Sequence, residues 1–390
     1  MRKQFKNMKL IYVHTGKFPS NSPSMTFVMY NAISLSKVTD KLFLFLKDNS
    51  VESTADIMRN TYSINMPSNF YLIRIKSLLG LKTNWLFFLQ VYFRIERQLK
   101  TEKFDAIITR STKFLPWLVR IKKKTVKVFY ETHDFFADLS ITDKKKTNTQ
   151  KRLSRYEKKY IPQLDGVFCL QQTQINLYKN AITNYDKYYL VRTGINKIYK
   201  ANFKERKYLS YIGSFDSHKG IEDLLNVFSE IAVGNKLLLI GGKSKKEIQS
   251  IEKLIVSMSL SEKVIVTGWL EKEKIYKLLQ ETLIGIVPLQ PTFFNKNLTS
   301  PLKIFDYYSC GIPVLGSDLS TTRELIQENQ TGFFFEPGNQ NDLKKKLIAI
   351  LSDIEMLKKI SDNIYEYAKT LLWDERAKLI LNIISGKENE

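Results

Sequence analysis

One stretch of the sequence, SPLKIFDYYSCGIPVLGSD at residues 300–318, combines residue types that could bind a phosphorylated ligand. We expect a helix that begins at its Ser-Pro pair, with Thr299 or Ser300 as the capping residue. The free N–H groups and the dipole of such a helix end attract an anion, and the ammonium of Lys303 in the first turn would add to that attraction. Asp306 follows one turn later on the same face, where its carboxylate could accept the hydroxyls of a ribose. The alternative is an ordinary capped helix with Asp306 in solvent.

A second stretch, YIGSFDSHKGIEDLL at residues 211–225, predicts a strand, a short polar loop and a helix. The strand ends at Gly213, and Lys219 and Gly220 precede the helix. A glycine turn between a strand and a helix, with a lysine beside it, is typical of phosphate-binding loops. The glycine spacing differs from that of a Walker loop, and an exposed lysine before an ordinary helix would give the same pattern.

Alternating apolar strands and helices are expected to position these residues. Strand-like runs lie at residues 9–16, 41–47, 104–111, 126–134, 165–172, 188–195, 207–215, 235–242, 262–270, 283–290 and 311–318. This alternation predicts an α/β fold with two doubly wound, Rossmann-like domains facing a central cleft. Ligands of such folds bind at the carboxyl ends of the strands, so the cleft is the expected site. We place the joint between the domains near residues 195–206.

The charge of the chain is concentrated in its first half. The net charge is +22, and residues 1–195 contain 34 lysines and arginines against 14 aspartates and glutamates, whereas residues 196–390 contain 27 against 25. A cationic half indicates a polyanionic partner, either an acidic membrane surface or nucleic acid. An AT-rich genome that favours lysine codons would explain many lysines but not this asymmetry.

Length and composition exclude several classes of protein. The 390 residues are typical of two domains. The two cysteines, Cys169 and Cys310, form neither a disulfide framework nor a metal-ligand spacing, which favours a cytoplasmic protein. The longest apolar-rich segment, residues 85–93, is shorter than the roughly 18–20 residues that cross a bilayer. The apolar run near the basic N-terminus is too short for a signal peptide.

The order of the motifs resembles the donor-binding domain of the retaining glycosyltransferases of family four, which have the GT-B fold. The resemblance runs through YIGSF, HKGIEDLL, LLLIGG, VIVTGWL, IGIVPL, SPLKIFDYYSCGIPVLGSD, RELI and TGFFFEPGNQNDL. In the first half, VKVFYETHD is similar to that family's strand ending in Glu-x-His, and LVRTGI is similar to its Asn-Gly turn. WDERAKLILNII resembles the final helix that crosses back to the first domain. The implied domains are 1–195 for the acceptor, 196–365 for the nucleotide-sugar and 366–390 for the final helix.

The resemblance implies transfer of a sugar from a nucleoside diphosphate sugar to an acceptor hydroxyl, with retained anomeric configuration. It assigns Lys219 and Lys303 to the donor diphosphate, Asp306 to the ribose and His133 to the neighbourhood of the transferred sugar. Gly16 matches a glycine loop that closes over the phosphates. An alternative for His133 is a strand-end histidine that bonds to a neighbouring carboxylate. The remaining candidates for donor binding are Gly213, Ser214, Thr299 and Ser300, with Gly268 and Trp269 near the base.

Three positions depart from the family pattern. Leu298 stands where the first of two glutamates is expected, so backbone N–H groups of residues 297–300 would contact the sugar there. Asp306 replaces the second glutamate, and Ser214 replaces an arginine that contacts phosphate. No Asp-x-Asp motif follows a strand of the first half, so we expect transfer without a metal or other cofactor. The two lysines and the helix end would then stabilise the charge that develops on the leaving diphosphate.

The first domain of this family binds the acceptor, and here it is rich in basic and aromatic residues. The aromatics around residues 70–94 could form an interfacial surface beside basic side chains, or they could fill the core. We expect a peripheral protein on the inner face of the plasma membrane, facing a lipid-linked or surface glycan acceptor. The residues concerned are Lys122, Lys123, Lys124, Lys127, Lys144, Lys145, Lys146, Lys151, Arg152, Arg155, Lys158 and Lys159, together with Phe70, Tyr71, Leu72, Trp85, Phe87, Phe88, Tyr92 and Phe93, which alternate with Arg74, Lys76, Lys82 and Arg94.

The leading interpretation is a bacterial glycosyltransferase of lipopolysaccharide, capsule or glycolipid synthesis. A non-hydrolysing nucleotide-sugar epimerase has the same fold, but it would need several carboxylates around the sugar, and Leu298 argues against that. A nucleic-acid-binding protein that uses the basic half is the alternative from another class. The aromatic residues of that half form no recognisable RNA-binding motif, so we expect no nucleic-acid partner.

Overall fold

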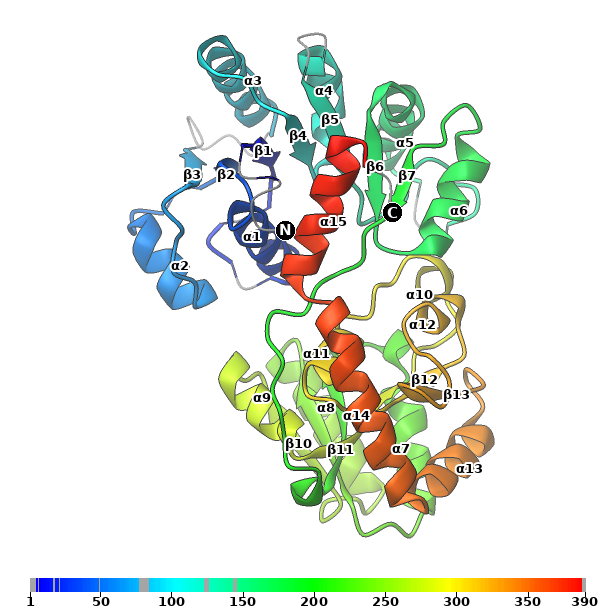
Figure 1. The fold of residues 1–390 in the computed structure, drawn as a ribbon. Coiled ribbons are helices and arrows are strands. Elements are labelled where there is room, and N and C mark those ends of the chain that lie inside the picture. Colours follow the sequence, from blue (N-terminus) through cyan, green and yellow to red (C-terminus); the bar gives the residue numbers. More distant parts are fainter. Residues whose placement is uncertain are drawn as a thin grey trace. The chain divides into compact units, whose positions relative to one another are not determined.

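The computed structural model describes residues 5, 7–16, 18–20, 22–48, 50–76, 84–122, 126–142 and 146–387. The chain divides into two compact units (Figure 1). Unit 1 comprises Met1–Gly194 and Trp373–Glu390, and unit 2 comprises Ile195–Leu372. The domain boundary expected at residue 195 coincides with the first boundary of this division, and the one expected at residue 365 lies seven residues before the second boundary, at Leu372.

Unit 1 is built on a parallel sheet whose described strands follow the order β3-β2-β1-β4-β5-β6-β7. Strand β1 pairs with both β2 and β4, so the strand order reverses between β1 and β4. The strands are β1 (Lys9–Val13), β2 (Lys41–Lys47), β3 (Phe70–Ile75), β4 (Ala106–Thr109), β5 (Lys127–Glu131), β6 (Gly166–Cys169) and β7 (Tyr188–Leu190). The helices are α1 (Pro23–Ser36), α2 (Thr54–Tyr62), α3 (Asn84–Thr101), α4 (Leu115–Lys122), α5 (Asn148–Tyr160), α6 (Gln172–Ala181) and α15 (Trp373–Ser385).

Helix α15 belongs to unit 1, although it comes at the end of the chain. It lies beside α1 (Figure 1) and buries Ala377, Ile380 and Leu381. The rings of Phe27 and Trp373 meet edge to face with centroids 4.9 Å apart. This apolar contact joins residues that are far apart in the sequence.

Unit 2 repeats the architecture with the strand order β10-β9-β8-β11-β12-β13. Its strand order reverses between β8 and β11, which pair in parallel. The strands are β8 (Tyr208–Gly213), β9 (Lys236–Gly241), β10 (Val264–Gly268), β11 (Thr282–Val287), β12 (Val314–Ser317) and β13 (Gly332–Phe335). The helices are α7 (Ile221–Glu230), α8 (Lys245–Ser257), α9 (Lys272–Gln280), α10 (Phe293–Asn297), α11 (Leu302–Ser309), α12 (Ser320–Arg323), α13 (Gln340–Leu351) and α14 (Ile354–Thr370).

Both sheets confirm the prediction of two doubly wound, Rossmann-like domains. Every predicted strand is present, with somewhat narrower bounds, because strands buried on both faces of a parallel sheet are almost continuously apolar. The sequence analysis did not predict strands β3 and β13 or the short helices α10 and α12.

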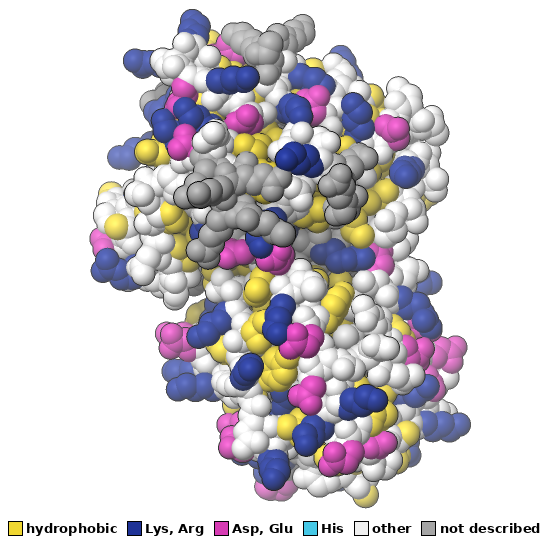
Figure 2. Space-filling model, viewed as in Figure 1, with side chains coloured by type: hydrophobic (Ala, Val, Ile, Leu, Met, Phe, Trp, Pro, Cys, Tyr) yellow, Lys and Arg dark blue, Asp and Glu magenta, His cyan; other side chains and the backbone are white. Residues whose placement is uncertain are grey.

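The aromatic residues around 70–94 are divided between the core and the surface. Phe87 and Phe88 are each 3% exposed, whereas Trp85 and Phe93 are 57% and 61% exposed. Lysine and arginine side chains are spread over the visible face, among acidic ones (Figure 2). None of the described helices is both long and apolar enough to pass through a bilayer. Five of the basic residues singled out from the sequence lie outside the described residues, namely Lys82, Lys123, Lys124, Lys144 and Lys145.

Candidate functional site

The loops that follow β8 and β11 meet where the strand order of unit 2 reverses. The backbone N–H of Gln290 and the side-chain amide of Asn295 donate to the carbonyl of His218 at 3.1 and 3.0 Å. Gly220 has a φ of +69°, and a Cβ there would lie 1.8 Å from the carbonyl oxygen of Pro288. Only glycine allows this approach, which brings the loop ending in Lys219 against the loop that follows β11. Such a reversal point is where ligands bind in doubly wound folds.

Lys303 projects from the first turn of α11 towards the end of β8. Its stem is partly exposed, but its Nζ is buried and has no hydrogen-bond partner among the residues that the structure describes. The Nζ lies 3.7 Å from the centroid of the Tyr211 ring. A Cβ at Gly213 would lie 3.5 Å from the same Nζ, so the ammonium lies beside the glycine that ends the strand. An aromatic face stabilises a cation in part, but it leaves the N–H donors of this ammonium unused.

The pKa values of the two lysines of the site are both lowered. Burial lowers the pKa of Lys303 well below its usual 10.5, and the charge of Lys219 lowers it further while Asp306 opposes the shift. Burial also lowers the pKa of Lys219, with Asp216 acting against it. Two desolvated cations that act on each other are an unfavourable arrangement. A bound anion would relieve both, which makes this the strongest candidate for a ligand site in the described chain.

The expected cap of α11 is wrong. The N-cap residue is Pro301, in an extended conformation, and no side chain caps the helix. The reason is that α11 begins at Leu302, one residue later than expected, so the cap position falls on Pro301, whose side chain has no acceptor. The N–H of Thr299 instead donates to the carbonyl of Phe294 in the preceding helix α10, at 2.9 Å. Thr299 is buried and Ser300 is half-buried just before α11. Their role in donor binding stays a prediction.

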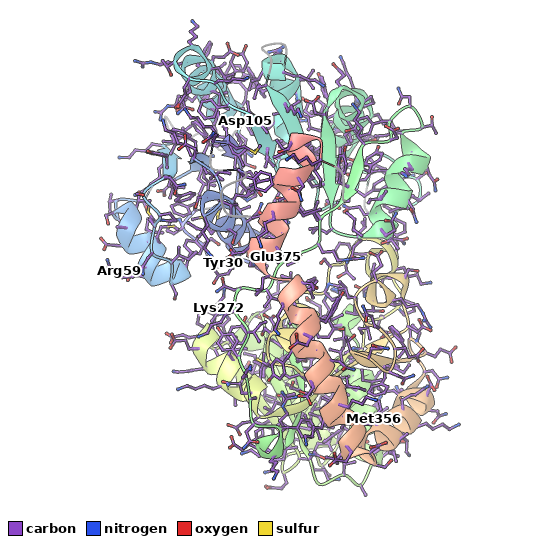
Figure 3. The ribbon with its side chains drawn as sticks, in the orientation of Figure 1. Tyr30, Arg59, Asp105, Lys272, Met356 and Glu375 are labelled. Atoms are coloured by element: carbon purple, nitrogen blue, oxygen red, sulfur yellow. The ribbon has the colours of Figure 1, made fainter. Side chains whose placement is uncertain are left out.

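Asp306 has a partner that the sequence analysis missed. The hydroxyl of Tyr276 donates to Oδ1 of Asp306 at 3.0 Å, and the Tyr276 ring stacks on Tyr199 with centroids 4.2 Å apart. Burial raises the pKa of Asp306, against the lowering effects of Tyr276, Lys272 and Lys303. Lys272 lies at the start of α9 (Figure 3). No spacing in the sequence links Tyr276 to Asp306. The hydroxyl uses one carboxylate oxygen, so the other can still accept a ligand hydroxyl.

Three further predicted residues lie at the carboxyl ends of strands in unit 2. Ser214 follows the last residue of β8, Gly268 is the last residue of β10, and Trp269 follows it. The hydroxyl of Ser214 donates to Asp216 at 2.7 Å, so in this structure it stabilises its own loop. Gly268 ends β10 with a φ of +67°, and the next residue, Trp269, is 67% exposed. The Trp269 ring is therefore available for a contact with a base.

In unit 1, the predicted residues Gly16 and His133 lie near a histidine that the sequence analysis did not single out. A Cβ at Gly16 would lie 2.4 Å from Nε2 of His14. Burial, with the charges of Arg110 and His133, lowers the pKa of His14 to about 3. His14 is thus a neutral imidazole, and in the described chain neither of its ring nitrogens has a hydrogen-bond partner. His133 is exposed at the end of β5. The catalytic roles of Lys219, Lys303 and His133 stay predictions.

Glu131, two residues before His133, is part of a buried hydrogen-bond network in unit 1. It is fully buried and accepts hydrogen bonds from the Tyr12 hydroxyl and the Arg376 guanidinium. Burial alone would raise the pKa of Glu131, but the charges of Arg376 and Arg110 hold it below its usual 4.5. Arg376 also donates to the carbonyl of Arg192 at 2.7 Å and to Asn31. The carboxylate therefore links β5 to α15.

Comparison with known proteins gives a family match for unit 2. Residues 195–367 match the family described as Glycosyl transferases group 1, and this range covers nearly all of unit 2. An uncharacterized glycosyltransferase of Methanocaldococcus jannaschii is 24% identical over 216 residues, which are 54% of this chain and 56% of that protein. The N-acetyl-alpha-D-glucosaminyl L-malate synthase of Bacillus anthracis is 24% identical over 45% of this chain and 43% of the synthase. The match thus spans about half the length of these two relatives.

A third relative and a solved structure extend further along the chain. An uncharacterized 41.2 kDa protein in the cps region of Klebsiella pneumoniae is 26% identical over 64% of this chain and 71% of that protein. The crystal structure of Anabaena HepE in complex with UDP covers 97% of this chain and 100% of its own, with a TM-score of 0.73 and 13% identity. This likeness shows the GT-B fold.

Proposed function

We propose that the protein is a glycosyltransferase that moves a sugar from a nucleoside diphosphate sugar to an acceptor hydroxyl. The observation that carries the proposal is the ammonium of Lys303 beside Gly213, which is buried and has no hydrogen-bond partner in the described part of the chain. It lies in the range that matches Glycosyl transferases group 1, at the point where the strand order reverses. A diphosphate would supply negative oxygens to this ammonium and to Lys219.

The proposed reaction retains the anomeric configuration and uses no metal. The bond between the anomeric carbon and the diphosphate oxygen breaks, and its electron pair goes to the leaving diphosphate. Lys219, Lys303 and the start of α11 stabilise that charge as it develops. The acceptor oxygen bonds to the same face of the anomeric carbon, and the leaving phosphate takes its proton. His133 positions the transferred sugar, while the second oxygen of Asp306 accepts a ribose hydroxyl.

The proposed acceptor is a lipid-linked or surface glycan on the inner face of the plasma membrane, where the protein would be a peripheral, cytoplasmic enzyme. The cps-region relative supports a role in surface polysaccharide synthesis. The excess of 34 basic over 14 acidic residues in residues 1–195 supports attachment to an anionic surface. Neither an epimerase nor a nucleic-acid-binding protein is favoured by the domain match.

Slow donor hydrolysis tests the proposal without knowledge of the acceptor. We would incubate the protein with UDP-, GDP- and dTDP-sugars and measure release of the nucleoside diphosphate, with and without EDTA. The expected result is hydrolysis of one donor class at equal rates in both buffers. Nuclear magnetic resonance of the recovered donor detects epimerisation, and an inverted hydroxyl without hydrolysis would favour the epimerase.

A further inference from the structure

Unit 1 contains a hollow of about 690 Å³ that is lined by residues of three helices. It lies between the start of α3, the start of α4 and one face of α5. Aromatic lining residues come from each helix: Trp85, Trp117 and Tyr156. The volume falls within the roughly 300–1,000 Å³ of typical small-molecule sites. None of the donor-site residues described above lines this hollow.

The aromatic rings of the hollow are held in place by other rings. Trp117 packs against Tyr92 with centroids 5.4 Å apart, and Tyr156 meets Tyr160 edge to face at 5.7 Å. Trp85 is 57% exposed, so most of its surface is unused by the fold. Exposed aromatic faces in a pocket provide flat apolar surfaces for a ligand. The C–H face of a sugar ring has the complementary shape and polarity.

The charged side chains among the described lining residues are positive. They are Lys113, Arg120 and Arg152, and no aspartate or glutamate is among those described lining residues. Arg120 lies over the Trp117 ring, 5.2 Å from its centroid. In the described part of the chain, no acidic side chain forms an ion pair with these three residues. Three unpaired cations around aromatic surfaces select a ligand that carries negative charge.

A second hollow of unit 1 has a volume of about 510 Å³, and its lining includes Gly16, Lys47 and Asp48. The carboxylate of Asp48 is paired with Arg74. Asn84, the first residue of α3, lines both hollows. The hollow beside Gly16 and the aromatic pocket therefore adjoin at this residue.

We propose that the aromatic pocket binds an anionic saccharide unit of the acceptor glycan, one that carries a carboxylate or a phosphate. The acceptor chain would continue past Asn84 towards Gly16, so the pocket recognises a unit several sugars from the reacting hydroxyl. The role as an acceptor subsite rests on the proposed glycosyltransferase activity. The binding of an anionic saccharide is a property of the pocket alone.

Calorimetric titration of the full-length protein tests the binding. The probes are trigalacturonate, the neutral maltotriose and a single-stranded uridine pentanucleotide. We expect trigalacturonate to bind at least tenfold more tightly than maltotriose, because only the former carries carboxylates. Equal binding of the two trisaccharides, no binding of trigalacturonate, or tighter binding of the pentanucleotide would overturn the proposal.

Two matched variants separate pocket binding from the general charge of unit 1. Lys113→Gln/Arg152→Gln removes two charges from the pocket, and Arg59→Gln/Lys179→Gln removes two exposed charges from α2 and α6 (Figure 3 shows Arg59). We expect trigalacturonate to bind at least tenfold more weakly to the first variant and less than twofold more weakly to the second. Equal losses in the two variants would overturn the proposal.

An aromatic substitution and a donor readout complete the experiment. Trp85→Ala should weaken binding of the trisaccharide, and Trp85→Phe should restore most of it; unchanged binding by Trp85→Ala would contradict the stacking role. Thermal stabilisation by UDP, GDP or dTDP should be the same in all pocket variants. If no nucleotide stabilises the protein while trigalacturonate still binds to the pocket, the glycosyltransferase proposal fails and the binding site remains.

Discussion

A buried ammonium without a hydrogen-bond partner is costly. Lys303 of α11, beside the end of β8, is such a group among the described residues. Lys219 increases the cost, because its charge lowers the pKa of Lys303 further. Proteins retain such groups where a bound ligand supplies the missing hydrogen-bond partner. We therefore expect the ligand-free protein to be less stable than a variant in which this charge is absent.

Lys303→Met tests the cost of the charge directly. We expect the variant without ligand to be more stable at neutral pH, by about 1–3 kcal/mol in the free energy of unfolding. The unfolded chain binds more protons than the folded one between the lowered pKa of Lys303 and its usual 10.5. Wild-type stability therefore rises with pH in that interval, and the advantage of the variant should shrink.

Urea unfolding at pH 7 and at pH 9.5 measures both effects. Lys345→Met, at an exposed position of α13, is the matched control and should leave stability nearly unchanged. A Lys303→Met protein that is less stable than the wild type at pH 7 would show that the ammonium has a stabilising partner.

Much of the candidate site could be predicted at the level of residues, but its partners could not. Lys219 and Lys303 were visible because lysines beside glycine turns and helix starts have a local signature. Tyr276, which bonds to Asp306, lies 30 residues away from it along the chain, and no local pattern encodes such a contact. The cap of α11 was wrong because the helix begins at Leu302, one residue later than its Ser-Pro pair suggested, which leaves Pro301 at the cap position.

At the scale of elements, the strands were predictable and some connections between them were not. The runs that became β2 and β8 are apolar and bounded by polar residues, which is typical of buried parallel strands. The contact of α15 with the rest of unit 1 depends on a buried network around Glu131 and Arg376. That network joins residues 245 positions apart, and it is visible only in three dimensions.

Arg376→Ala tests how much this network holds α15 in place. The variant leaves the buried Glu131 with Tyr12 and with Arg110, whose nitrogen is 3.7 Å away. We expect a loss of about 3–5 kcal/mol in the free energy of unfolding of unit 1. The control is Lys378→Ala, which breaks an exposed pair with Glu375 on the same helix and should cost less than about 1 kcal/mol. Similar small losses in both variants would contradict a stabilising role for the network.

At the scale of the whole molecule, the unequal charge of the two halves is the feature that the fold alone does not require. Each lysine or arginine near an anionic bilayer contributes roughly 1 kcal/mol of attraction. The exposed residues Lys158 and Lys159 of α5 belong to the basic half, while Lys345 and Lys346 of α13 are exposed in unit 2. These pairs allow a matched comparison of equal charge loss.

Flotation with anionic vesicles measures the attraction. We expect the wild type to float with anionic vesicles at physiological salt and to stay in the bottom fraction with neutral vesicles. Lys158→Gln/Lys159→Gln should weaken binding about thirtyfold, and Lys345→Gln/Lys346→Gln should change it little. Absence of wild-type binding at physiological salt would exclude the membrane proposal.

The central claim is that Lys303 and Lys219 hold the diphosphate of a nucleotide-sugar donor, and thermal unfolding with UDP, GDP and dTDP tests it most directly. At a saturating concentration, one of these nucleotides should raise the melting temperature of the wild type and of Lys345→Met by several degrees. It should leave Lys303→Met unchanged. An equal rise in Lys303→Met, or no rise with any nucleotide in the wild type, would contradict the claim.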